Sequence, residues 1–270
     1  MKREHKDEMK ARARNIVLEV AYDGTAYHGF QRQSPPVVAV QNVLEEKLAV
    51  VFGDSIELAA AGRTDAGVHA YGQVVNFFTD GRIPTERITR AVNSLLPSDI
   101  AIRCAAEATR DFSARHSARS KQYLYRIQQG TTPNPLTARY AHYERRPLDV
   151  DAMRAALETI LGTHDFSSFR ASGGAPMSPV RTMYEATIEA REGDILECRI
   201  HGDGFLYHMV RNIVGTLLNV GLGNISADGF AEIFAAKSRS RASATAPACG
   251  LYLEYVRYEK DDFINPWQNR

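Results

Sequence analysis

The sequence predicts an α+β fold made of two ferredoxin-like lobes, each with the element order strand, helix, strand, strand, helix, strand (βαββαβ). Three observations predict it. Runs rich in apolar and β-branched residues, bounded by Gly, Pro, Asn or Asp, are typical of strands. Other runs carry apolar residues at helical spacing. The order of these runs in the first half of the chain returns in the second half, which predicts a pseudo-twofold relation between the lobes and a basic central cleft.

The first half begins with a predicted strand, residues 15–22 (NIVLEVAY), which ends at the turn Asp23-Gly24. Residues 38–53 (VAVQNVLEEKLAVVFG) have apolar residues at helical spacing, and Gly53 closes this predicted helix. Two strands, a helix stopped by a proline and a further strand complete the predicted lobe: residues 56–64, 71–80, 85–97 and 99–109.

The second half repeats this order. It begins with a strand, a helix and a hairpin that turns at Glu192-Gly193: residues 123–130, 149–163, 182–192 and 194–203. A longer helical segment follows at residues 205–223, with Phe205, Met209, Ile213 and Leu217 on one face. A helix that begins at a Ser226 cap and a last strand, residues 226–237 and 250–259, complete the lobe.

The chain therefore divides into a tail and two lobes. Residues 1–14 hold six basic and three acidic side chains with few apolar ones, which is typical of a mobile tail. We expect an N-terminal α+β lobe, residues 15–115, and a C-terminal α+β lobe, residues 116–270, with the junction between Thr109 and Tyr123.

The composition is that of a globular protein: 44% of residues are hydrophobic and 24% are charged. No segment reaches the roughly 18 apolar residues of a membrane span, and residues 1–14 contain no apolar stretch like that of a signal peptide, so we expect a cytoplasmic protein with no membrane partner. Cys104, Cys198 and Cys249 lie far apart and form no C-x-x-C pair, so we expect reduced, packed thiols.

Positive charge gathers at the junction of the predicted lobes, although the formal net charge of the whole chain is only +1. Five basic residues face a single acid, Asp111, over 17 positions: Arg110, Arg115, Arg119, Lys121 and Arg126. Such a strip can bind phosphates, and a solvated basic face is the alternative. Its place at a junction where a cleft can form favours nucleic-acid binding.

A charged triplet, Arg63-Thr64-Asp65, interrupts two predicted strands in the run AAAGRTDAGVHAYGQVVNFF. Glycines at 62, 67 and 72 permit a tight backbone path, so the loop can present a carboxylate to a cleft. Taken alone, Asp65 could equally be a turn residue or a helix cap.

The wider sequence resembles the TruA family of tRNA pseudouridine synthases, bacterial type, over nearly its whole length. GRTDAGVHA is the most specific match. Further matching stretches are EVAYDGTAYHGFQRQ, AVNSLLPSDIAI, DFSARHSARSKQYLYRI, THDFSSFRASGG, GFLYHMVRNIVGTLLNVG and ATAPACGLYLEYV. The N-terminal tail and KDDFINPWQNR lie outside the pattern.

The resemblance implies an isomerase that converts uridine to pseudouridine at positions 38, 39 and 40 of the tRNA anticodon arm and uses no cofactor or metal. It assigns Asp65 as the nucleophile that forms a covalent adduct, at the sugar C1′ or the uracil C6. It assigns Arg63 to the space that the flipped base leaves. A salt bridge or a phosphate contact is the alternative for Arg63.

Two further residues receive roles from the resemblance. Tyr123 matches a tyrosine that stacks on the target uracil, but alternation places it on the same strand face as Tyr125, so both could instead be core. Arg211 lies in an otherwise apolar helical run and needs an anionic partner. The resemblance supplies Asp65, whose pKa an arginine nearby would lower. A salt bridge to another acid is the alternative.

Other residues are expected to line the site or bind RNA. Leu251 matches a residue of the pocket wall, and Arg115, Arg119 and Lys121 are the expected phosphate contacts. Tyr22, Asp23 and Gly24 belong to a matching early loop. The sequence departs from the family pattern at Asp203 and in SGGAPMSPVRT, which could alter contacts with tRNA.

Metal and nucleotide cofactors are not expected. Asp65 and His69 are four residues apart, but Gly67 disfavours a helix there and no third ligand presents itself. His201, Asp203 and His208 fit caps, packed rings or RNA contacts better than catalysis. The glycines of HGDGF do not have the spacing of a phosphate-binding loop.

The expected partners are tRNA and a second copy of the chain in a homodimer, as the resemblance implies. A non-catalytic RNA-binding protein is the alternative from another class, because ferredoxin-like lobes resemble RNA-recognition modules. It would need no Gly-Arg-Thr-Asp loop together with Tyr123 and Arg211. Pseudouridine synthesis on another RNA would share the chemistry and differ in surface contacts.

Overall fold

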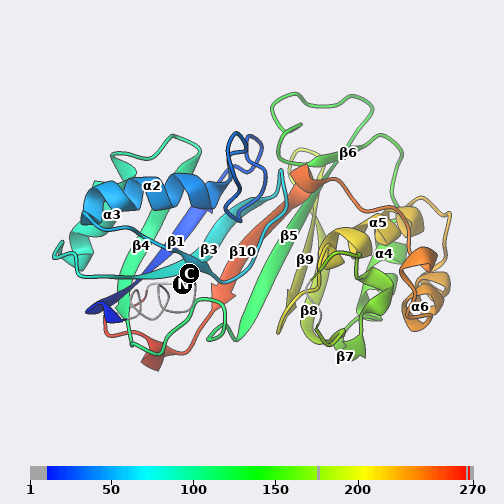
Figure 1. Ribbon diagram of the computed structural model, residues 1–270. Helices are drawn as coiled ribbons and strands as arrows, with labels where there is room; N and C mark the ends of the chain where they lie inside the picture. The colour runs from blue at the N-terminus through cyan, green and yellow to red at the C-terminus, as the bar shows by residue number, and fades with distance from the viewer. Residues whose placement is uncertain (1–10, 175–176, 266, 268–270) are drawn as a thin grey trace. The chain divides into compact units, whose positions relative to one another are not determined.

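The computed structural model describes residues 11–174, 177–265 and 267. The chain forms two compact units: unit 1 comprises Met1–Arg119 and Leu253–Arg270, and unit 2 comprises Ser120–Tyr252. Helices and strands alternate in both, so the predicted α+β class is confirmed (Figure 1). The last strand returns to unit 1, whereas the sequence placed it in the C-terminal lobe, because its pairing with a strand of the first half is a long-range contact.

In unit 1 the strands of the sheet follow the order β4-β1-β3-β10, and β1 pairs antiparallel with both β3 and β4. Its strands are β1 (Arg14–Tyr22), β2 (Ala59–Ala60), β3 (His69–Thr79), β4 (Ile100–Ala108) and β10 (Leu251–Arg257), of which β2 also pairs with β3. Leu18 on the central strand β1 lies opposite Val75 on β3 and Ala105 on β4. Helices α2 (Val40–Phe52) and α3 (Thr85–Asn93) lie on one face of this sheet (Figure 1).

The apolar pattern of unit 1 explains this packing. Leu44 and Leu48 of α2 and Ile88 of α3 are fully buried, as is Leu18 on β1. Gly53 ends α2 in the left-handed conformation, φ 70°, as its position after the helical run predicted. The strand predicted at residues 56–64 is two residues long in the structure. Ala59 and Ala60 pair with β3, and the chain then enters the loop that carries Asp65.

The predicted N-terminal tail lies largely outside the described residues. Its last residues, however, are held in place: the Arg12 side chain donates to the Ser55 carbonyl at 2.7 Å, and Arg14 donates to Glu107 at 3.0 Å. Strand β1 begins at Arg14, which lies opposite Thr79 of β3, one residue earlier than predicted.

In unit 2 the strands follow the order β5-β9-β8-β7 with antiparallel pairing, and a short strand β6 pairs in parallel with β5. Its strands are β5 (Ser120–Gln129), β6 (His142–Glu144), β7 (Gly162–Asp165), β8 (Val180–Arg191) and β9 (Ile195–Gly202). Its helices are α4 (Val150–Glu158), α5 (Met209–Gly221) and α6 (Ala227–Ala235). Among the described residues there are also four short 3-10 helices: η1 (Ser167–Phe169), η2 (Arg239–Arg241), η3 (Ala248–Gly250) and η4 (Lys260–Asp262).

Helix α5 is the centre of the core of unit 2. Ile213 and Leu217 are fully buried, as the helical spacing predicted. The helix begins at Met209 rather than at Phe205, because His208 takes a left-handed backbone conformation, φ 59°. The three cysteines are free thiols, and burial raises the pKa of Cys198 to about 12.

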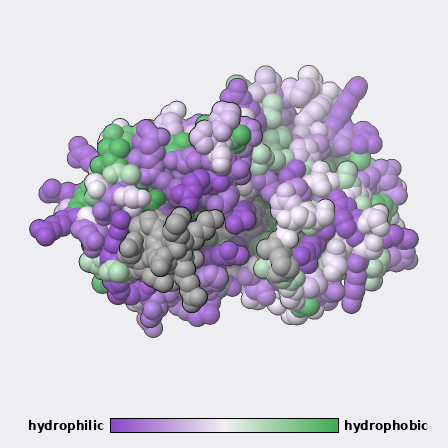
Figure 2. Space-filling model, in the orientation of Figure 1, coloured by the Kyte–Doolittle hydropathy of each residue, from purple (hydrophilic) through white to green (hydrophobic). Residues whose placement is uncertain are grey.

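The molecular surface in the view of Figure 2 is mostly hydrophilic, with apolar residues in small separate patches. Within the described part of the chain, no helix is long and apolar enough to cross a bilayer.

Candidate active site

The loop that carries Asp65 connects β2 to β3 in unit 1, and Thr64 anchors it from within. Thr64 is 6% exposed, and its hydroxyl lies 2.7 Å from the buried hydroxyl of Tyr22 at the end of β1. The neighbours of Thr64 point the other way: Arg63 is exposed and Asp65 is half-buried. The loop therefore hides one side chain and presents the two charged ones.

The early loop, residues 23–30, holds the backbone of the Asp65 loop. The Phe30 amide donates to the Thr64 carbonyl at 3.0 Å, and the Gly67 amide donates to the Tyr27 carbonyl at 3.4 Å. Within the Asp65 loop, the Val68 amide donates to the Asp65 carbonyl at 3.1 Å. This turn requires the positive φ of 76° at Gly67, which glycine adopts without strain.

Two glycines let the loops approach this closely. A Cβ on Gly24 would lie 2.0 Å from the Val68 carbonyl oxygen, and a Cβ on Gly29 would lie 2.7 Å from the Thr64 carbonyl oxygen. Both contacts are with backbone, which cannot move aside as a flexible side chain can. The early loop is thus the direct support of the Asp65 loop.

Strand β3 supports the loop from its other end. The Gln73 side chain, fully buried, donates to the Gly62 carbonyl at 2.9 Å. The His69 ring is 2% exposed; its Nδ1 accepts from the Gly24 amide at 3.1 Å and lies 3.1 Å from an Asp23 carboxylate oxygen. His69 is therefore a packed side chain, and the described residues hold no group of three or more His, Cys, Asp or Glu side chains suited to a metal ion.

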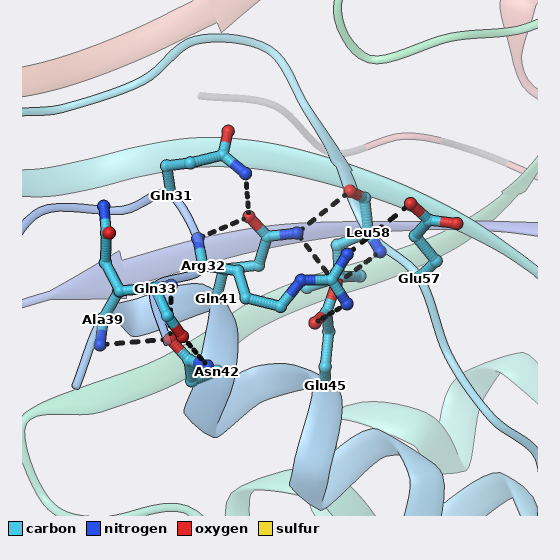
Figure 3. Close-up of polar contacts among 9 residues, drawn as sticks. All are labelled: Gln31, Arg32, Gln33, Ala39, Gln41, Asn42, Glu45, Glu57 and Leu58. Carbon is cyan, nitrogen blue, oxygen red and sulfur yellow. Dashed lines mark hydrogen bonds and ion pairs between the residues drawn. The ribbon is translucent and has the colours of Figure 1, made fainter. Parts of the chain in front are cut away.

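A polar network fixes the segment after the early loop to α2 (Figure 3). The Gln41 side chain accepts from the Arg32 amide at 2.9 Å and donates to Glu45 at 2.8 Å. Glu45 also accepts from the Leu58 amide at 3.0 Å and from the Arg32 guanidinium at 3.0 Å. The Gln41 amide donates to the Phe30 carbonyl at 3.0 Å, so the network continues through Phe30 to the Asp65 loop.

In unit 2, Arg211 lies in the first turn of α5 and is only half-buried. Its Nε donates to the Ala246 carbonyl at 2.8 Å, and the Ala246 amide donates to the Arg211 carbonyl at 3.0 Å. Gly215, one turn further along α5, has no room for a Cβ, which would lie 1.9 Å from the Ala244 carbonyl oxygen. The segment around Ala246 is thus pressed against α5 and orients the guanidinium.

The two tyrosines of β5 that the sequence left open are both buried, and they differ in their contacts. Tyr125 is fully buried and donates its hydroxyl to the Pro247 carbonyl at 2.9 Å, and burial raises its pKa far above the ordinary value. Tyr123 is 8% exposed and makes an edge-to-face contact with Phe205, with ring centroids 4.8 Å apart. Leu251, at the start of β10, is buried.

The basic strip is partly engaged with the protein itself. Arg110 donates to the Arg12 carbonyl at 2.7 Å, Arg119 pairs with Glu259 at 3.2 Å, and Arg126 pairs with Glu197 at 2.9 Å. Arg115 is exposed and Lys121 is half-buried. Of these, the pair of Arg119 and Glu259 is well exposed and easily exchanged for a phosphate contact.

The sequence matches a family model described as tRNA pseudouridine synthase over residues 19–117 and 156–259. It is 45% identical over 91% of its length to the whole of tRNA pseudouridine synthase A from Acetivibrio thermocellus. It is 47% identical to the same enzyme from Halalkalibacterium halodurans, over 88% of this chain and 90% of that one.

The chain belongs to the tRNA pseudouridine synthase family. It is thus an enzyme, an RNA-modifying isomerase that converts uridine in tRNA to pseudouridine. The predicted family is confirmed. Among solved structures, an archaeal box H/ACA sRNP Nop10-Cbf5 complex is similar over 75% of this chain and 44% of that chain, with 13% identity and a TM-score of 0.33, which is too weak to carry an argument.

The match of this pseudouridine synthase to the family model covers the Asp65 loop, Arg211 and Leu251. Tyr123 falls between the two matched segments. The sequence did not single out Gln73 or the contact between Tyr22 and Thr64. Contacts between residues far apart in the chain leave no pattern in the local sequence.

Proposed function

We propose that this pseudouridine synthase acts on uridines 38, 39 and 40 of the tRNA anticodon arm, with Asp65 as its nucleophile. The observation that carries the assignment of Asp65 is the construction of its loop. The loop is held by Phe30 and Gln73 through its backbone and by Tyr22 through the Thr64 hydroxyl, while Asp65 stays half-buried and Arg63 stays exposed. A firmly held loop that presents a carboxylate is what covalent catalysis requires.

The reaction exchanges one bond for another without net oxidation. The bond between N1 of uracil and C1′ of ribose breaks, the uracil turns, and a bond between C5 and C1′ forms. The proton on C5 is then lost, and N1 ends with a proton. Asp65 divides this exchange into two steps by a temporary bond to C1′ or to C6 of the uracil, and both sites of attack stay open.

The remaining roles follow from the family and are part of the proposal. Arg63 fills the space that the flipped uridine leaves, and Tyr123 stacks on the uracil. Arg211 favours the ionised form of Asp65, and Leu251 lines the pocket. The rigid hold of Ala246 on the Arg211 side chain supports an orienting role, and Arg115, Arg119 and Lys121 supply phosphate contacts.

We also propose a cytoplasmic homodimer that recognises the anticodon arm by shape, because one site must accept three neighbouring uridines. The lobes are proposed to be ferredoxin-like and related by a pseudo-twofold, with the substrate in a basic cleft. The strand order β4-β1-β3, with β2 on the other edge of β3, supports this description for unit 1. No cofactor takes part in the proposed reaction.

The test is a map of pseudouridine in an unmodified tRNA transcript after incubation with the wild-type enzyme and with Asp65→Asn. We expect product at one or more of positions 38–40 with the wild type and none with the variant. Thermal unfolding of both proteins separates lost chemistry from lost fold, and we expect the two Tm values to agree closely because Asp65 is not a core residue. Product at other positions only, or an undiminished rate with Asp65→Asn, would contradict the proposal.

A further inference from the structure

We infer that Tyr22 is a positioning residue for Asp65 and that it acts through the hydroxyl of Thr64. The inference rests on the proposed role of Asp65 as the nucleophile. Tyr22 is 5% exposed, and its hydroxyl lies 2.7 Å from the Thr64 hydroxyl, where both atoms are buried. Since Thr64 is the residue directly before Asp65, its orientation sets the direction in which the next residue leaves the backbone.

The pairing of β1 in the sheet places Tyr22 beside Thr64. Tyr22 is the last residue of β1, the strand that pairs with both β3 and β4. Between Val20 and Tyr22 the pairing with β3 shifts, so that Val20 lies opposite Gln73 and Tyr22 lies opposite Ala70. A second shift interrupts the pairing with β4 between Glu19 and Val20. Bulges of this kind redirect side chains and occur often beside active sites.

Two other contacts leave Thr64 little freedom. Its carbonyl accepts from the Phe30 amide at 3.0 Å, and the Phe30 ring lies 6.0 Å from the Tyr22 ring, centroid to centroid. The carbonyl of Gly62, two residues earlier, accepts from the buried Gln73 side chain. With the main chain fixed on both sides of Arg63, the Tyr22 hydroxyl determines how the Thr64 side chain is held.

Tyr22 stays a neutral phenol over the range in which the enzyme works. Burial raises its pKa far above the ordinary value, and the hydrogen bonds from Thr64 and Gln73 offset this only in part. The hydroxyl therefore holds Thr64 as a hydrogen-bonding group rather than as a charge. Its removal should change the placement of the nucleophile and leave the pH dependence of the reaction unchanged.

The test compares two tyrosines of unit 1 whose hydroxyls form hydrogen bonds within the protein. Tyr22→Phe removes the hydroxyl that faces Thr64, and Tyr258→Phe removes one that donates to the Ala114 carbonyl at the same distance, 2.7 Å. Rates and KM are measured on an unmodified tRNA transcript, together with the Tm of each protein. We expect kcat of Tyr22→Phe to fall about 10- to 100-fold with KM nearly unchanged, since small displacements of a reacting group have effects of this size. Tyr258→Phe should lower the Tm to a similar extent and keep the wild-type kcat.

Variants of Thr64 show whether the effect passes through its hydroxyl. Thr64→Val should lower kcat as Tyr22→Phe does, Thr64→Ser should keep most of the activity, and the double variant of Tyr22→Phe with Thr64→Val should be no slower than either single variant. If the two effects multiply, or if Tyr22→Phe is no slower than Tyr258→Phe, the inference is wrong.

Asp65→Asn, assayed in parallel, separates this inference from the proposed function. If Asp65→Asn is inactive while Tyr22→Phe keeps the wild-type kcat, only the positioning role of Tyr22 fails. If Asp65→Asn keeps the wild-type rate, the assignment of the nucleophile fails, and the inference fails with it.

Discussion

Arg211 and Ala246 are joined by two reciprocal hydrogen bonds: the Arg211 side chain donates to the Ala246 carbonyl at 2.8 Å, and the Ala246 amide donates back to the Arg211 carbonyl at 3.0 Å. This pairing uses one nitrogen of the guanidinium and leaves the rest of the planar group to face other partners. A lysine carries a single ammonium group. It cannot donate to the Ala246 carbonyl and also present a planar group to a second partner in another direction, as arginine can.

We therefore expect Arg211→Lys to lower kcat by at least about tenfold, with a loss of about 1 kcal/mol in the free energy of unfolding. Single-turnover assays and guanidinium unfolding measure the two effects. Arg154→Lys is the control, because Arg154 is half exposed on α4 and pairs with the exposed Asp151. A wild-type rate for Arg211→Lys would show that the charge alone suffices.

Gly24→Ala should push the early loop away from the loop that carries Asp65. The new Cβ would lie 2.0 Å from the Val68 carbonyl oxygen, so the backbone of one loop must shift. We expect the free energy of unfolding to fall by about 3 kcal/mol or more and the activity to fall further than stability explains.

Gly193→Ala is the control for this glycine substitution. Gly193 has a φ of 74° and open space around its Cβ position, so alanine there costs only the roughly 1 kcal/mol of a left-handed backbone. Equal effects of Gly24→Ala and Gly193→Ala on stability would contradict the close approach of the loops.

Glu45→Ala should show how much the polar network of Figure 3 contributes to the stability of unit 1. Glu45 accepts from the Leu58 amide and the Gln41 side chain, both buried, and their loss leaves two donors without an acceptor. We expect a loss of about 2–4 kcal/mol in the free energy of unfolding. The neighbouring Glu46→Ala serves as control, since Glu46 is 67% exposed and pairs with Lys47, and its effect should stay within about 0.5 kcal/mol.

Acid should weaken unit 2 through Glu197. Burial by itself raises the pKa of Glu197, but hydrogen bonds from Arg199 and Arg126 outweigh it, so the pKa lies below its ordinary value. A carboxyl group with a lower pKa in the folded state adds stability above its unfolded pKa, and this contribution is lost as the pH falls through the folded pKa.

We expect the wild type to be more stable than Glu197→Gln near neutral pH, and the difference to shrink below about pH 4. Urea unfolding at a series of pH values measures both proteins. A difference that stays constant down to pH 3 would show that the carboxylate charge of Glu197 does not contribute.

Local patterns predicted the long elements well. The long apolar runs that form α5 and β3 were enough, because nearly every residue of both elements is buried. Strands β6 and β7 were missed, since three and four residues are too few to show a period. The start of α5 was placed four residues early, because nothing in the composition marks the left-handed backbone of His208.

In the candidate site, too, local patterns predicted some features and missed the long-range contacts. The Asp65 loop could be found from its charged triplet between glycines, and its role came from resemblance. The contact of Tyr22 with Thr64 joins residues 42 positions apart, and the contact of Arg211 with Ala246 joins residues 35 apart. Such contacts depend on how the sheet and helix fold back, which no short stretch of sequence encodes.

Because β10 returns to unit 1, that unit cannot complete its sheet until the end of the chain has been synthesised. The ribosome completes β3 early, but its partner strand from Leu253 on emerges only after all of Ser120–Tyr252 has been made, on the order of ten seconds later. During that interval the nascent chain carries the Asp65 loop next to a sheet edge that still lacks its partner. Open edges attract foreign strands, so this period is when the growing polypeptide most needs the protection of a chaperone.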